Sequence, residues 1–158
     1  SAAENNMNPA QAMSVAQVIQ LAVAPVFLLA GVGATLNVLA TRIGRIIDRA
    51  RAMEAELVHA SPERADDLHG RLKVLSKRAS LINRAIALSV LSGLLVSLVV
   101  AALFVSSVLR LELAVPIAVV FVAALLSLAA ALVYFLREVL IATAALTFGG
   151  VRVPKQDT

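Results

Sequence analysis

Residues 85–109 read AIALSVLSGLLVSLVVAALFVSSVL, an uncharged stretch that lies between Arg84 and Arg110. At about 1.5 Å per residue, a helix of this length extends about 37 Å, more than the roughly 30 Å hydrocarbon core of a bilayer. Two other stretches share this character: residues 15–41 contain no charge, and residues 113–136 lie between Glu112 and Arg137. The sequence therefore predicts three transmembrane helices, over residues 15–41, 85–109 and 113–136.

The composition places this chain in the class of all-α membrane proteins. Of its 158 residues, 60% are hydrophobic and 15% charged, and the mean hydropathy is +0.90. Soluble domains average about 45–50% apolar and about 25% charged residues, so the polar residues here are too few to cover a soluble globule. The chain has no cysteine and two histidines, and no Walker, HExxH or GxSxG motif. We therefore expect no cofactor, no metal site and no enzymatic activity.

The positive charges predict the orientation in the membrane. Ten of the fourteen Lys and Arg residues lie between Arg42 and Arg84, and residues 1–14 contain none. Cytoplasmic segments are enriched in Lys and Arg, so residues 42–84 and the C-terminus are expected in the cytoplasm, with the N-terminus outside. Residues 1–14 and 149–158 are expected to be flexible tails. Residues 42–84 contain no aromatic residue for base stacking, so we do not expect a nucleic-acid partner.

Apolar residues in the segment 42–84 recur at steps of three and four, the spacing of seams that pack helix on helix. One seam comprises Ile46, Ala50, Met53 and Leu57, and the second comprises Leu68, Leu72, Leu75, Ala79, Ile82 and Ile86. Between the seams, Ser61-Pro62-Glu63 is typical of a helix start, with Ser61 as N-cap. The pattern predicts an antiparallel helical hairpin that extends the first two spans into the cytoplasm. Residues 137–148 are expected to extend the third helix in the same way.

Several residues within the spans are candidates for helix packing. Small residues allow close approach of helices, and an amide in lipid favours a partner across a helix interface. The packing candidates, within or between subunits, are Gly31, Gly33, Asn37, Ser89, Gly93 and Ser97. The alternative is a polar path lined by Thr35 and Asn37. Pro25 interrupts the backbone hydrogen bonding of the first span and is either a packing kink or a hinge.

Arginines gather where the first two spans meet the predicted hairpin. Arg42, Arg45, Arg49 and Arg84 could anchor the helices at the membrane surface or bind the headgroups of anionic lipids. Asp48 is expected to pair with Arg45, three residues away. Membrane lipids are therefore the expected small-molecule partners, and no sequence motif indicates a particular protein partner.

Three blocks of sequence resemble a known family. They are APVFLLAG at 24–31 followed by LNVL at 36–39, RASLINRAI at 78–86, and FLREV at 135–139. Together with Arg42, Arg45 and Asp48-Arg49, they are similar to a family of bacterial inner-membrane proteins catalogued as domain of unknown function twenty-seven twenty-one. The resemblance covers about residues 18–148. It implies residence in a bacterial inner membrane and supports the three spans, but it implies no substrate and no catalytic residue. In such a membrane, the orientation expected from the positive charges makes the N-terminus periplasmic.

Two functional hypotheses follow. The first is a homo-oligomeric structural or interaction module whose cytoplasmic hairpin packs against copies or partners. The second is an oligomeric ion channel lined by the first span, in which Thr35 and Asn37 face the path.

Overall fold

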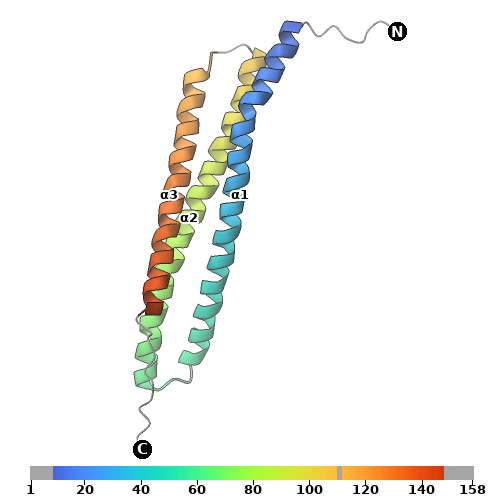
Figure 1. Cartoon of the computed structure of the whole chain (residues 1–158). Coiled ribbons are helices and arrows are strands. Elements are labelled where there is room, and N and C mark those ends of the chain that lie inside the picture. Colours follow the sequence, from blue (N-terminus) through green and yellow to red (C-terminus); the bar gives the residue numbers. More distant parts are fainter. Residues whose placement is uncertain (1–8, 110–111, 148–158) are drawn as a thin grey trace, which may run out of the picture. The chain divides into compact units, whose positions relative to one another are not determined.

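The structure is a computed structural model that describes residues 9–109 and 112–147, and this part of the chain is all-helical. Its helices are α1 (Pro9–Leu57), α2 (Pro62–Leu109) and α3 (Ala114–Thr147), labelled in Figure 1. Each contains a segment long and apolar enough to cross a membrane, within Ile19–Leu57, Pro62–Leu109 and Ala114–Ala144. The prediction of three long apolar helices is confirmed.

The helix ends refine the sequence prediction. α1 begins at Pro9, so residues 9–14 are helical although the sequence placed them in a flexible tail. Proline suits the first turn of a helix because the N–H that it lacks has no intrahelical partner there. α2 begins at Pro62, as the Ser-Pro-Glu pattern predicted, and the Ala65 amide donates to the Ser61 carbonyl at 2.8 Å. The rest of the N-terminal tail, residue 148 and the tail 149–158 lie outside the described residues.

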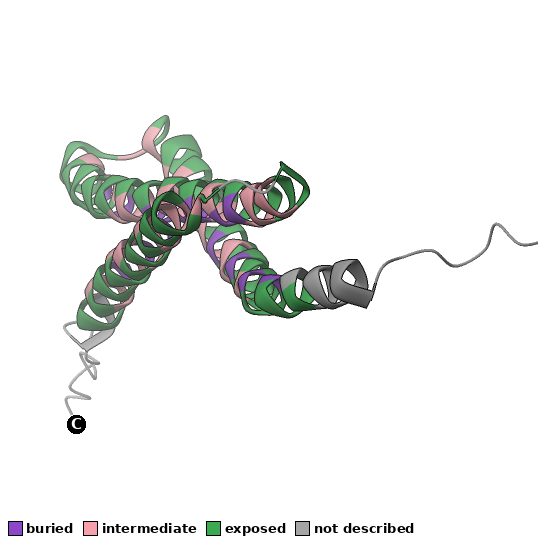
Figure 2. Ribbon diagram, turned by 90° about the horizontal axis from the view of Figure 1, so that it is seen from above, coloured by how far each residue is buried: buried purple, intermediate pink, exposed green. Residues whose placement is uncertain are grey.

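The described part of the chain divides into two units. The apolar unit comprises residues 1–38 and 87–130. Its buried residues include Ala22 and Val32 of α1, Val96 and Val99 of α2, and Ala124 of α3. The Ser92 hydroxyl donates to the Ala124 carbonyl at 2.8 Å and so joins α2 to α3. Most of the ribbon in Figure 2 is nevertheless coloured as exposed, and many of the exposed residues in this unit are large and apolar. Such a surface suits a lipid environment.

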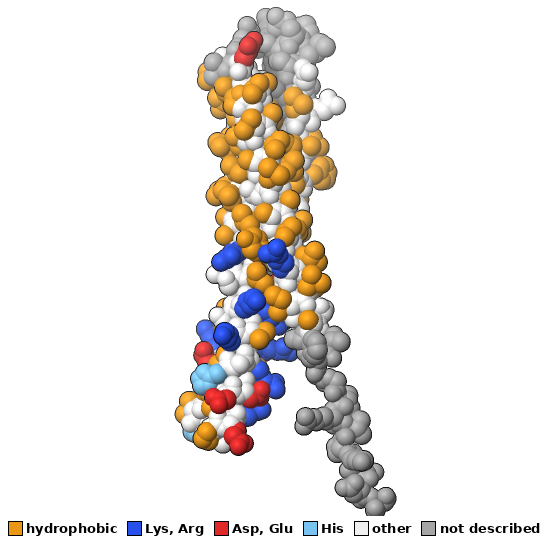
Figure 3. Space-filling model, turned by 90° about the vertical axis from the view of Figure 1, so that its left-hand side faces the viewer, with side chains coloured by type: hydrophobic (Ala, Val, Ile, Leu, Met, Phe, Trp, Pro, Cys, Tyr) orange, Lys and Arg blue, Asp and Glu red, His pale blue; other side chains and the backbone are white. Residues whose placement is uncertain are grey.

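The charged unit comprises residues 39–86 and 131–158 and carries most of the charged side chains, seen in Figure 3. Its core joins Leu39 and Ile46 of α1 to Leu75, Ile82 and Ala85 of α2. Further partly buried residues pack against this core: Ile43, Ala50, Met53, Ala79, Ile86, Tyr134 and Phe135. Residues of both predicted seams therefore meet in one core, which confirms the packing that the three-and-four spacing indicated.

Candidate functional site

The most unusual residue of the charged unit is Glu138 of α3, whose side chain is completely buried. Arg78 of α2 reaches its Oε1 with two nitrogens, Nε at 3.0 Å and Nη2 at 2.8 Å. Arg42 of α1 approaches Oε2, with 3.4 Å between that oxygen and Nε. One buried carboxylate therefore holds arginines from two other helices. Because a buried charge is costly without partners, this cluster links α3 to α1 and α2.

Aromatic residues of α3 complete this cluster. The Arg42 guanidinium carbon lies 5.3 Å from the centre of the Phe135 ring, and that of Arg84 lies 5.9 Å from the centre of the Tyr134 ring. Both distances fall within the range of cation–π attraction. Arg42 and Arg84, two of the four arginines predicted to bind lipid headgroups, thus contact α3.

A cleft of about 770 Å³ opens within the charged unit, and the two arginine partners of Glu138 line it. Its lining residues are Arg42, Arg45, Ile46, Asp48 and Arg49 from α1, Arg71 and Arg78 from α2, and Ala142 from α3. The structure therefore brings Arg42, Arg45 and Arg49 to one cleft, while Arg84 is not among its lining residues. The expected pair between Asp48 and Arg45 is absent: no ion pair within 4.0 Å joins these two described residues. In an exposed setting such an i, i+3 pair gains little, so solvent competes with it.

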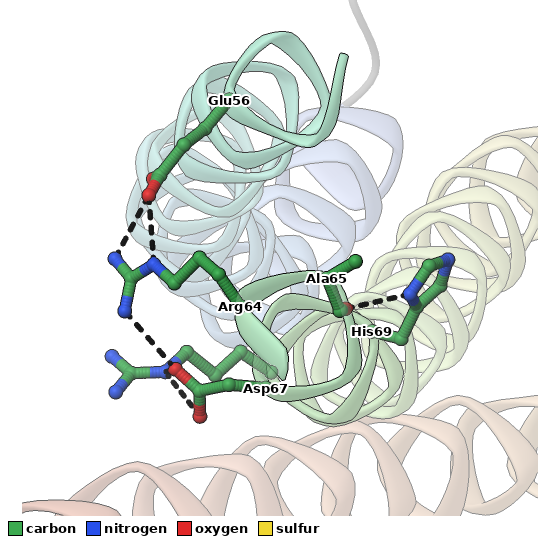
Figure 4. A network of polar contacts seen from close by, with 6 residues as sticks. Glu56, Arg64, Ala65, Asp67 and His69 are labelled. Carbon is green, nitrogen blue, oxygen red and sulfur yellow. Dashed lines mark hydrogen bonds and ion pairs between the residues drawn. The ribbon is translucent and has the colours of Figure 1, made fainter. Parts of the chain in front are cut away.

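A second ionic network lies where α1 connects to α2 (Figure 4). Arg64 contacts Glu56 of α1 at 2.8 Å and Asp67 of its own helix at 3.2 Å. Asp67 in turn contacts Arg71 at 3.1 Å. The His69 ring nitrogen Nδ1 lies 2.7 Å from the Ala65 carbonyl. These side chains are exposed, so the network orients the connection more than it stabilises the fold.

The packing candidates of α2, which are Ser89, Gly93 and Ser97 at steps of four residues, are covered only in part. Ser89 is buried and Gly93 lies against α1, with space for a Cβ at 3.5 Å from Val32 Cγ1 and 3.7 Å from Leu29 Cδ1. Ser97, by contrast, is exposed, and its hydroxyl bonds the Gly93 carbonyl of its own helix at 2.9 Å. Four residues turn a helix by about 400°, so residues spaced four apart shift around the helix by about 40° at each step. The buried residues Ser89, Ser92, Val96 and Val99 instead alternate steps of three and four, which keeps them facing one neighbour.

The packing candidates of α1 are exposed, and Gly31 and Gly33 lie about 160° apart around the helix, on either side of the buried Val32. Gly31, Gly33 and Asn37 are exposed, and nothing lies within 4 Å of a Cβ built on either glycine. The Thr35 hydroxyl donates to the Gly31 carbonyl at 2.9 Å, so its own helix satisfies it. Gly31 and Gly33 therefore have no side chain of the described residues packed against their Cβ positions.

Pro25 occupies a buried position, and α1 is a single helix across it. Proline removes the hydrogen bond to the carbonyl four residues earlier, that of Leu21. Both residues line an apolar cleft of about 760 Å³ within the apolar unit. Val99 and Phe121 line it from α2 and α3, with Ser106 and Glu112 as its polar members.

Sequence reasoning missed Glu138 as a functional residue. It appears in the sequence only as the acid next to Arg137 at the end of the third span. The available signal was that Glu138 is the only acid between residues 113 and 148 and lies in a predicted helix, where a buried charge requires cationic partners. Which arginines supply them depends on the packing of three helices.

Comparison with known proteins identifies a family but no relative of known activity. The family described as "Protein of unknown function (DUF2721)" matches residues 22–148, most of the chain. No curated protein and no solved structure matches the sequence.

Proposed function

Since the chain belongs to this family of unknown function, we propose that it is a homo-oligomeric interaction module of the bacterial inner membrane, assembled through the face of α1 that carries Ala30, Gly33 and Asn37. Gly33 carries this proposal because it lies in an apolar span and nothing lies within 4 Å of its Cβ position. Ala30, Gly33 and Asn37 are all exposed, and at 100° per residue they fall within about 60° on one face. A small-residue face beside an amide favours close contact between membrane helices.

The charged unit supports the same proposal, because contacts between its helices give it a defined surface that could bind partners in the cytoplasm. Glu138 links α3 to Arg78 and Arg42, and the apolar core links α1 to α2. The unit therefore has one packed arrangement that subunits or partners could recognise. A channel lined by α1 has less support, because the Thr35 hydroxyl donates its hydrogen bond to a carbonyl of its own helix.

We predict that Gly33→Leu shifts the protein from oligomer toward monomer in native mass spectrometry in detergent. The larger side chain would hold two α1 helices apart, while nothing in its own chain lies within 4 Å of the Cβ position. The far-UV circular dichroism spectrum should therefore remain that of the wild type. The matched control is Ala101→Leu, an exposed small residue of the span in α2. A wild-type monomer, or an oligomer lost only in Ala101→Leu, would refute assembly through α1.

We also predict that Ser61 is cytoplasmic and Glu112 periplasmic, because Lys and Arg are concentrated between residues 42 and 84. Ser61→Cys and Glu112→Cys place thiols at exposed positions of a chain without native cysteine. In intact spheroplasts, a membrane-impermeant thiol reagent should label the cysteine at 112 and leave the one at 61 unlabelled until the cells are lysed. The reverse pattern would invert the proposed orientation.

A further inference from the structure

The cleft of the charged unit is lined by more basic than acidic side chains. Arg42, Arg45 and Arg49 follow each other at steps of three and four, so they lie within about 60° on one face of α1. Arg71 and Arg78 are seven residues apart and share a face of α2 in the same way. The two faces bring five guanidinium groups to one cleft, and Asp48 is the only acid among its lining residues.

These arginines differ in whether a carboxylate of the protein already pairs with them. Arg78 and Arg42 are held by the buried Glu138, and Arg71 contacts Asp67 at 3.1 Å. Arg45 and Arg49 are exposed, and no carboxylate lies within 4.0 Å of either one among the described residues. Three arginines of the cleft are therefore paired with carboxylates, and two guanidinium groups are available to a ligand.

Arginines that only anchor helices at the membrane surface would not need to line one cleft. Arg51 of α1 and Lys73 of α2 are also exposed, but each is about 160–200° around its helix from the cleft-lining arginines Arg42 and Arg71. Neither lines the cleft. The cleft is also large enough for a small ligand, since such sites measure about 300–1,000 Å³.

We propose that this cleft binds a phosphate ester, with Arg45 and Arg49 on the phosphate oxygens. The planar guanidinium group donates two parallel hydrogen bonds to phosphate and is well suited to this recognition. Asp48, which lines the same cleft without an ion pair to the neighbouring arginines, would accept a hydrogen bond from a hydroxyl or ammonium group of the ligand. A glycerophosphate group has this combination, either as the headgroup of an anionic lipid or as a soluble ester. The proposal does not depend on subunit number.

The test compares two charge-matched double variants of the full chain. Arg45→Gln/Arg49→Gln removes the two available cleft arginines, and Arg51→Gln/Lys73→Gln removes the same charge outside the cleft. The soluble source is tested by calorimetric titration of glycerol 3-phosphate into protein in phosphatidylcholine nanodiscs. The lipid source is tested by native mass spectrometry of lipids retained from mixed phosphatidylglycerol and phosphatidylcholine nanodiscs.

We expect the cleft variant to lose about tenfold or more of its affinity for at least one of these probes, and the control less than about twofold. Binding of glycerol 3-phosphate identifies a soluble ester, and retention of phosphatidylglycerol without it identifies a lipid headgroup. Ala142→Phe should reduce the same binding, because it fills the cleft without changing its charge. Equal losses in both double variants, or no binding of either probe by the wild type, would overturn the proposal.

Discussion

Replacing Glu138 with alanine is expected to lower the melting temperature of the detergent-solubilised protein by on the order of 10 °C. The Glu138 side chain is 0% exposed, and its main partner Arg78 is 15% exposed. Removing one member of a buried ion pair costs about 3–5 kcal/mol, because the remaining charge stays buried without a partner. Arg42 loses its contact as well but is 32% exposed, so solvent compensates much of that loss. The measurement is thermal unfolding followed by circular dichroism.

Two further variants test whether the loss comes from the buried charge. Glu54→Ala removes an exposed carboxylate of the same unit and should leave the melting temperature within about 2 °C of wild type. Glu138→Leu/Arg78→Leu removes both charges and should recover part of the loss, because an apolar pair can replace a buried ion pair. An unchanged melting temperature in Glu138→Ala would mean that α3 does not depend on this contact.

Gly93→Leu is expected to destabilise the apolar unit by about 1–3 kcal/mol, the usual cost of overpacking. A Cβ at this position would lie 3.5 Å from Val32 Cγ1 and 3.7 Å from Leu29 Cδ1, which are ordinary contact distances. The Cβ therefore fits, but the additional carbons of leucine would meet these side chains and push α1 from α2. Thermal unfolding in detergent measures the loss.

The same distances predict the behaviour of two companion variants. Gly93→Ala should be neutral or stabilising, because alanine favours helix over glycine by about 1 kcal/mol and its Cβ has space. Gly31→Leu should leave the melting temperature near that of wild type, since nothing lies within 4 Å of a Cβ there. A melting temperature unaffected by Gly93→Leu would show that α1 and α2 do not pack at this residue.

The sequence by itself determined the three long apolar helices and the residues of the seams in the segment 42–84. Both features are local. An uncharged stretch such as 85–109 forms a helix because its backbone groups bond within the segment. The spacing of Ile46, Leu75 and Ile82 follows the period of the helix, and these residues meet in the core of the charged unit.

Only the tertiary structure decided which small residues are covered and which arginines are paired. Gly31, Gly33 and Gly93 look alike in the sequence, yet only Gly93 has side chains within 4 Å of its Cβ position. Likewise, nothing local to Glu138 identifies Arg78, sixty residues away, as its partner. The period of a helix shows which residues share a face, but that face is covered only where a neighbouring helix lies against it. The rotation of each helix about its own axis results from the packing of all three.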